Sequence, residues 1–196
     1  LKLTITKADV PADRKAVVTF TLADGAGIPL TIDNLDKLPI PGAMPARFTL
    51  AYLKEDTQTG LSEWLNYVLV PVKGAPYVYK GENKSPAIAE VTQPSILMDM
   101  GGSYREVGAG TYTYTFATVL PESYDRNATH RVGGETARGE REYVSNATYD
   151  FVPAGGALKT REVVATESCN QCHDPLALHG GLRVDTALCV TCHTSQ

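Results

Sequence analysis

The chain has few of the residues that most often carry covalent, metal or membrane chemistry. Its 196 residues include four cysteines, four histidines and one tryptophan. Acidic and basic residues nearly balance, and the formal charge of -4 gives no electrostatic indication of nucleic-acid binding. No apolar run approaches the roughly 20 residues of a membrane-spanning helix. We therefore expect no nucleic-acid partner and no membrane span, and the few cysteines and histidines become the informative positions.

All four cysteines fall in two copies of one five-residue motif, CxxCH, which is the attachment signature of c-type haem. Two thiols one helical turn apart can form thioethers to the two vinyl groups of one porphyrin, and the histidine that follows them can ligate the iron. The sequence therefore predicts two haem c groups. Their predicted attachment residues are Cys169, Cys172, Cys189 and Cys192, and their proximal iron ligands are His173 and His193.

Zinc is the main alternative cofactor. Without the histidines, the cysteines read C-x2-C-x16-C-x2-C, a spacing that suits a zinc ion held by four thiolates. Such a site needs neither His173 nor His193, whereas haem needs both, so we favour haem. A redox disulfide is a weaker alternative, because nothing around the cysteines resembles a βαβ unit.

The remaining histidines, His130 and His179, match the two distal ligands that a pair of six-coordinate haems requires. His179 follows His173 by only six residues, which include a helical turn rising about 1.5 Å per residue. That tether is too short to reach the opposite face of the same porphyrin. We therefore predict that His179 ligates the haem of His193, and that His130 completes the haem of His173. A plain surface-loop histidine is the alternative for His130.

Residues 168–193 are expected to form three short helices. Ser168 and Gln171 form a capping box at the first, Asp174-Pro175 begins the second and Gly180-Gly181 ends it, and Asp185 caps the third. This segment holds too little apolar material for a core of its own, so the haems would supply it. We expect the two haems in near contact, with at least one porphyrin edge uncovered.

Residues 1–155 are expected to form a mainly β domain, an antiparallel Greek-key sandwich or split barrel. Apolar residues alternate with period two in several segments that Gly- and Pro-rich turns separate. The predicted boundary to a dihaem-binding segment, residues 156–196, is Pro153–Gly156. The alternating segments include 1–5, 16–22, 48–52, 68–72, 112–116 and 143–151.

The β domain shows no catalytic constellation. Asp33-Asn-Leu-Asp36 is interpreted as a solvated turn, because its spacing matches no calcium loop. Gly133-Gly134 is interpreted as part of a mobile loop, because no strand-to-helix context suits a nucleotide fingerprint. Arg131 and Arg183 adjoin the expected haem segments and are candidate propionate contacts. Three glycosylation triplets begin at Asn83, Asn127 and Asn146.

The segment Leu176-Ala-Leu-His-Gly-Gly181 between the two motifs, with Arg183-Val-Asp185 after it, resembles the OmcA/MtrC-type extracellular decahaem cytochromes. Thr129-His-Arg-Val-Gly133 in a β-rich leader resembles them too. The resemblance is loose over residues 1–155 and specific over 168–193. It implies β domains that alternate with multihaem domains, with His173 and His193 as proximal ligands and His130 and His179 as distal ones.

Members of that family pass electrons to extracellular metal oxides, soluble metals, flavins or partner cytochromes. We therefore expect other multihaem cytochromes, or further copies of this chain, as partners. The chain stops three residues after His193, where the family continues through many more haems. It is then either the first part of a longer multihaem protein or a naturally short member.

Two functional hypotheses suit a dihaem segment. The first is an electron carrier whose two haems have bis-histidine ligation, which leaves no free iron position. The second is a haem enzyme, such as a small reductase, with one open iron, which requires that His130 or His179 is not a ligand. A zinc-stabilised β interaction module is the non-haem alternative. Since c-type haem is attached outside the cytoplasm, we expect a removed leader before Leu1 and a periplasmic, cell-surface or extracellular location.

Overall fold

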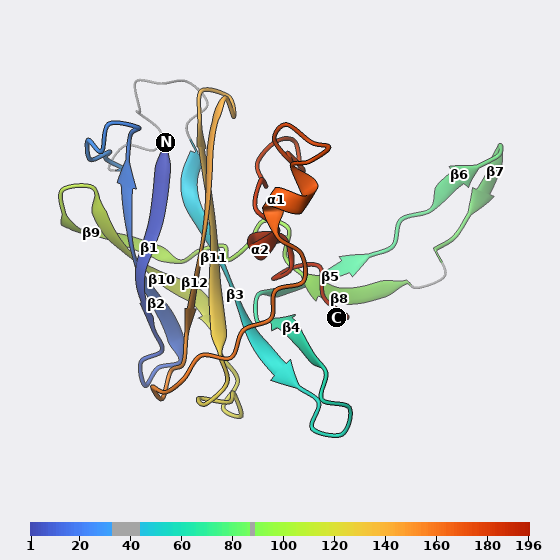
Figure 1. Ribbon diagram of the computed structural model, residues 1–196. Coiled ribbons are helices and arrows are strands. Elements are labelled where there is room, and N and C mark those ends of the chain that lie inside the picture. Colours follow the sequence, from blue (N-terminus) through green and yellow to red (C-terminus); the bar gives the residue numbers. More distant parts are fainter. Residues whose placement is uncertain (33–43, 87–88) are drawn as a thin grey trace.

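Two four-stranded antiparallel sheets form the body of the protein in the computed structural model, which describes residues 1–32, 44–86 and 89–196 (Figure 1). The strand orders are β1-β2-β10-β9 and β12-β11-β3-β4, and these sheets do not close into a barrel within the described residues. The predicted mainly β, antiparallel fold is confirmed. The turn at Asp33–Asp36 lies outside the described residues. The strands are β1 Lys2–Asp9, β2 Lys15–Ala23, β3 Met44–Glu55, β4 Ser62–Asn66, β9 Ser103–Gly108, β10 Thr111–Val119, β11 His130–Arg138 and β12 Tyr143–Phe151.

Aromatic side chains fill the space between the two sheets. Successive strand residues point to opposite faces, so the Thr-Tyr alternation of β10 buries Tyr112 and Tyr114. The Phe20 ring of β2 lies 5.7 Å from the Tyr112 ring and 4.9 Å from the Phe48 ring of β3, measured between centroids. Burial of apolar area contributes about 25 cal/mol per Å², so these large rings carry much of the stabilisation between the sheets.

Strand β11 corrects one interpretation of the sequence. Gly133 and Gly134 are not a mobile loop, because they lie in the middle of β11, which pairs with β12 on one side and β3 on the other. Both positions need a small residue. A Cβ atom on Gly134 would lie 2.9 Å from Phe48 Cε1, and one on Gly133 would lie 2.5 Å from Leu188 Cδ1. The glycines thus allow close packing on both faces of the strand.

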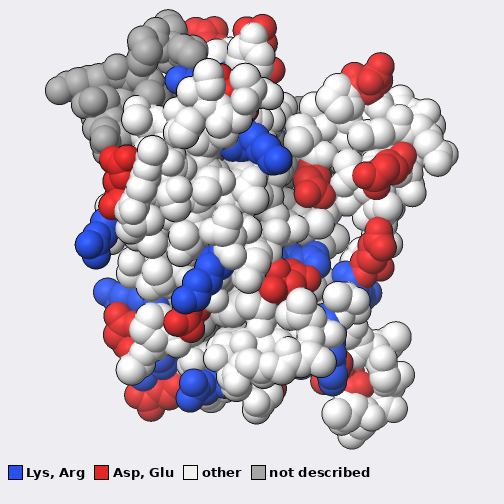
Figure 2. All heavy atoms as spheres, turned by 60° about the vertical axis from the view of Figure 1, so that its left-hand side comes forward, with Lys and Arg blue, Asp and Glu red and all other residues white. Residues whose placement is uncertain are grey.

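A thin arm projects from this body. It consists of two antiparallel ribbons, the first made of β5 Leu69–Lys73 and β8 Glu90–Pro94, the second made of β6 Tyr77–Tyr79 and β7 Glu82–Lys84 (Figure 1). On the face of the molecule that Figure 2 shows, acidic and basic side chains are interspersed, in keeping with the near balance of charge in the sequence.

The segment after β12 is mostly irregular and carries two short helices, α1 Thr166–Cys169 and α2 Thr186–Cys189. Asp185 caps α2 as predicted, and its side chain accepts a hydrogen bond from the Ala187 N–H. Two predictions were wrong. Helix α1 begins at Thr166 rather than after Ser168, and a turn closed by the Leu178–Arg183 β-bridge replaces the middle helix. Neither helix in the described part of the chain is long and apolar enough to cross a bilayer.

Candidate haem-binding site

The second CxxCH motif begins in α2, which packs on the outer face of the second sheet. Leu188 of this helix is 1% exposed and lies over Gly133 of β11. Thr191, inside the motif, is fully buried beside Thr49. The absence of a side chain at Gly133 brings the helix close to the strand, so the sheet serves as a rigid floor for this motif.

A buried asparagine ties the same motif to the sheet. Asn66, the last residue of β4, is 2% exposed. Its Nδ2 donates to the Thr191 carbonyl at 2.6 Å and to Thr49 Oγ1 at 2.9 Å, while its Oδ1 accepts from the Val68 N–H at 2.7 Å. The Asn66 side chain therefore binds the backbone both at Val68, just before β5 of the arm, and at Thr191 in the second motif, and so fixes the position of one relative to the other.

The two CxxCH motifs share one local geometry. The His173 N–H donates to the Cys169 carbonyl at 3.0 Å, and the His193 N–H donates to the Cys189 carbonyl at the same distance. Each motif is thus a single helical turn with its histidine just past the end. All four cysteines are free thiols, and both motif histidines are exposed. This arrangement fits covalent haem, because it presents two thiols and one imidazole from one turn.

The electrostatics of the second motif do not favour thiolates. Burial raises the pKa of the Cys189 and Cys192 thiols, although the Arg183 guanidinium opposes the effect at both. Among the described residues, no three His, Cys, Asp or Glu side chains are gathered around one metal position. Thioether formation consumes the thiols without requiring four of them to converge.

His179 lies beside His193, with 6.1 Å between the ring centroids. The two imidazoles are therefore neighbours in the fold, and both would be available to hold the iron of one haem. His179 is exposed and has a positive backbone φ of 51°, within the turn before Gly180. Partial burial lowers the pKa of His179, and the nearby Arg183 and His193 lower it further, which favours the neutral imidazole that metals bind.

His130 is placed away from the haem motifs. Side chains alternate along β11: Arg131, Gly133 and Glu135 face the haem segment, whereas His130 faces the interior between the sheets. The ring is fully buried, and both of its nitrogens are used. Its Nδ1–H donates to the Ala128 carbonyl at 2.9 Å, and its Nε2 accepts from the Tyr67 hydroxyl at 3.1 Å. This placement does not support the prediction that His130 ligates the haem of His173.

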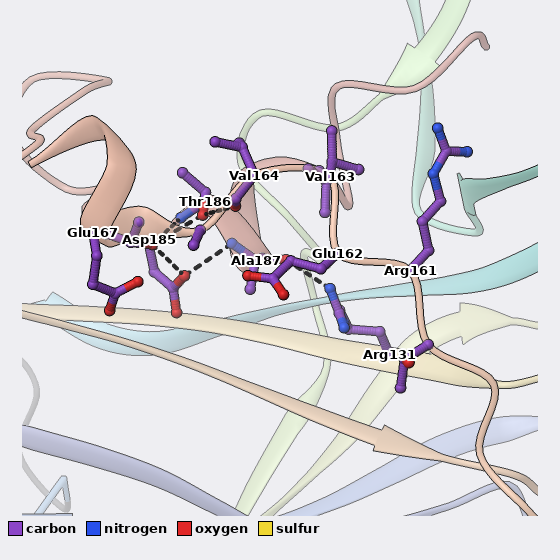
Figure 3. Close-up of a pocket in the computed structure, with 13 residues that line it drawn as sticks. Arg131, Arg161, Glu162, Val163, Val164, Glu167, Asp185, Thr186 and Ala187 are labelled. Atoms are coloured by element: carbon purple, nitrogen blue, oxygen red, sulfur yellow. Dashed lines mark hydrogen bonds between the residues drawn. The ribbon is translucent and has the colours of Figure 1, made fainter.

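Arg131 lines a cavity of about 460 Å³ between the segment at 160–167 and the start of α2 (Figure 3). Its guanidinium donates to both carboxylate oxygens of Asp150, at 2.6 and 2.8 Å, and lies 4.3 Å from the Trp64 ring centroid. It also donates to the Ala187 carbonyl at 3.4 Å. Arg131 is therefore already engaged in joining β11, β12 and α2. A haem propionate that bound Arg131, as predicted, would have to share the guanidinium with Asp150 and the Ala187 carbonyl.

Arg183 is more deeply engaged. Its side chain is 5% exposed, and its Nε donates at 2.9 Å to the Glu135 carboxylate, which is completely buried. The same carboxylate accepts from Arg47 Nη2 at 2.6 Å, and Arg183 Nη2 donates to the Ile96 carbonyl. The predicted propionate contact at Arg183 thus lies within a buried ion cluster. Arg47 Nε is buried there and has no hydrogen-bond partner in the described structure, so it is a free donor for an anionic group.

Sequence reasoning missed the residues that dock the haem segment on the sheet. Asn146, which had been noted only as a glycosylation triplet, uses its Nδ2 to donate to the Leu182 carbonyl and its Oδ1 to accept from the Val184 N–H. Asn66, Glu135 and Arg47 had no assigned role. These residues share no sequence signal, because each role depends on a contact with a residue far away in the chain.

No protein-family model matches the chain. The chain is 30% identical over 94% of its length to the multihaem cytochrome MtrC of Shewanella baltica strain OS185, and the match spans 28% of that protein. The crystal structure of the outer membrane decahaem cytochrome OmcA matches with a TM-score of 0.74 and 26% identity, covering 98% of this chain and 29% of that one.

The chain is a domain of the OmcA/MtrC type. The predicted membership of the OmcA/MtrC-type multihaem cytochromes is confirmed. The OmcA/MtrC-type domain spans less than a third of the length of either relative.

Proposed function

We propose that this OmcA/MtrC-type domain is an electron carrier with two covalently bound haem c groups. Cys169 and Cys172 hold the first haem, with His173 as its proximal ligand. Cys189 and Cys192 hold the second, with His193 as proximal and His179 as distal ligand. The observation that carries the proposal is the repeated single-turn geometry of the two motifs, together with the 6.1 Å separation of the His179 and His193 rings.

Haem iron supplies one-electron oxidation and reduction, and the protein sets its potential through ligands, hydrogen bonds and solvent exposure. The chain contributes a fixed seat for that chemistry. Leu188 and Thr191 hold the second motif against the sheet, and Asn66 satisfies the motif carbonyl that would otherwise be buried without a partner. A rigid seat reduces structural change during electron transfer, as a relay requires.

The proposed role is relay outside the cytoplasm. The 16 residues between the two cysteine pairs form a compact turn, so we infer that the haems lie close together. The exposure of His173, His179 and His193 supports at least one uncovered porphyrin edge. Other multihaem cytochromes or further copies of this chain are the proposed partners, and metal oxides, soluble metals or flavins are the proposed acceptors. A periplasmic, cell-surface or extracellular location follows from the chemistry of haem c attachment.

One observation favours a second candidate, a haem enzyme with an open iron position. His130 faces the interior of the β domain, so the distal position of the haem of His173 has no histidine assigned from geometry. An open position would allow a small ligand to bind that iron.

Visible spectra of the oxidised and reduced holoprotein separate these candidates. With His179 and His193 both available to its iron, the electron-carrier proposal predicts a low-spin second haem whose bands carbon monoxide does not change. Stoichiometric binding of carbon monoxide to one haem at neutral pH would support the enzyme candidate. A colourless, zinc-containing protein would contradict both.

A further inference from the structure

Three arginines and one buried glutamate gather beside His179. Glu135 accepts hydrogen bonds from Arg183 at 2.9 Å and from Arg47 at 2.6 Å. Arg141, on the β11–β12 turn, donates to the Gly180 carbonyl at 2.8 Å. These four side chains and His179 line one cavity of about 290 Å³. The cluster is therefore next to a proposed axial ligand of the second haem.

The cluster carries an excess of positive charge. Two guanidinium groups share the single Glu135 carboxylate, and Arg141 adds a third at the exposed rim. Solvent screens the inner ions little, because the side chains of Glu135 and Arg183 are 0% and 5% exposed. Asp185, which caps α2, adds a second carboxylate, which acts on Cys189. Even with this carboxylate counted, the three guanidinium groups outnumber the two carboxylates, so the net charge beside the second motif is positive.

The surroundings of the first motif have the opposite character. Helix α1 has Glu167 in its first turn and no basic residue in its last turn. Asp174 follows His173 directly. Two acidic residues thus adjoin the first motif in the sequence, whereas arginines line the cavity beside His179.

We propose that the Arg47–Glu135–Arg183 cluster, with Arg141, raises the reduction potential of the haem of His193 above that of the haem of His173. This inference rests on the proposed dihaem function. Reduction removes one positive charge from the iron, so a buried positive environment favours the reduced state and an acidic one opposes it. Electrons that enter the domain then settle on the second haem, which gives the relay a direction.

The test is an anaerobic spectroelectrochemical titration of the holoprotein. The two matched variants are Glu135→Gln and Arg183→Gln, which introduce the same side chain but change the charge in opposite directions. Arg141→Gln is a third variant at an exposed site, so the test survives if the buried variants do not fold. Lys7→Gln, at an exposed position of β1, is the control that removes a positive charge from the other sheet. A chain without the first cysteine pair identifies the potential of the second haem.

Glu135→Gln should raise the potential of the second haem, and Arg183→Gln and Arg141→Gln should lower it. One unit charge about 10 Å away, at an effective dielectric constant of about 20, changes a one-electron equilibrium by on the order of tenfold. That factor corresponds to about 59 mV. Lys7→Gln should leave both potentials unchanged.

A second haem with the lower potential in the unmodified protein would overturn the proposal. Shifts of the same sign for Glu135→Gln and Arg183→Gln would also overturn it, since they would indicate structural damage instead of charge. Haem content is measured in every variant. Two haems with unshifted potentials refute only this inference, whereas fewer than two haems in the unmodified protein refute the proposed function.

Discussion

Replacing Asn66 with alanine is expected to loosen the second haem motif from the sheet. The substitution removes the partner of two backbone groups, the Val68 N–H and the Thr191 carbonyl, both in buried residues. A buried polar group left without a partner costs about 1–3 kcal/mol. The free energy of unfolding should therefore fall by about 2–6 kcal/mol, a large share of the 5–15 kcal/mol typical of a domain.

Urea unfolding of the holoprotein, followed in parallel by haem absorbance and by far-ultraviolet circular dichroism, measures this change. Asn83→Ala is the matched control, because Asn83 lies exposed on β7 of the arm and should change stability by less than about 0.5 kcal/mol. If Asn66→Ala is as mild as Asn83→Ala, the asparagine does not hold the motif in place, and the proposed rigid seat is wrong.

Three further substitutions test other parts of the site. Gly133→Val should crowd Leu188 and lower the free energy of unfolding by about 1–3 kcal/mol. Gly25→Val is the control, because a Cβ at Gly25 meets nothing within 4 Å and should cause no packing penalty. Equal losses of stability in the two variants would contradict the close contact of α2 and β11. Burial lowers the pKa of His130, so stability should be highest above its ordinary value of about 6.5 and should fall as the pH drops below it, because the unfolded chain takes up the proton more readily. His130→Phe should flatten that pH dependence in urea unfolding and leave carbon monoxide binding unchanged, and a newly opened haem would restore His130 as a ligand. Replacing both Cys189 and Cys192 with alanine should lower the intact mass of the chain by one haem, and a variant that still carries two haems would disprove this attachment site.

The sequence predicted the β fold from side-chain alternation, and it predicted the chemistry of the haem segment from a motif whose spacing is set by covalent bonding. Alternation worked for β10 because its threonines and aromatics differ clearly in polarity. It did not reveal β11, because Gly133 and Gly134 contribute no side chain to the pattern. Their role depends on Phe48 and Leu188, which contact them from opposite sides of the sheet.

The distal ligands show where counting residues was insufficient. His179 lies beside His193, in agreement with an estimate of reach along the chain. His130 was paired with the first haem because four histidines match four axial positions and because the family resemblance implies it. Which way its ring faces depends on its position in β11 and on which side of the sheet the haem segment docks. The sequence did not reveal either of these, because it did not reveal β11, and it did not reveal Tyr67 and Ala128 as hydrogen-bond partners of the ring.

The middle helix expected after Asp174-Pro175 also depended on tertiary structure. Local capping signals favoured a helix there. In the structure, Leu178 and Arg183 pair as a β-bridge, so His179 lies in the turn between them, and the Arg183 side chain binds the buried Glu135 of the ion cluster. Burial of that ion cluster, which lies far away in the sequence, fixes the conformation. Local propensity alone therefore gave the wrong element at this point.

The central claim is that each CxxCH motif holds one covalent haem. The direct measurement is intact mass of the denatured chain, combined with a pyridine haemochrome assay on the same sample. The account predicts two haems per chain, with the mass of both retained after denaturation. A chain at its bare polypeptide mass without a Soret band, or one that holds zinc in place of haem, would contradict it.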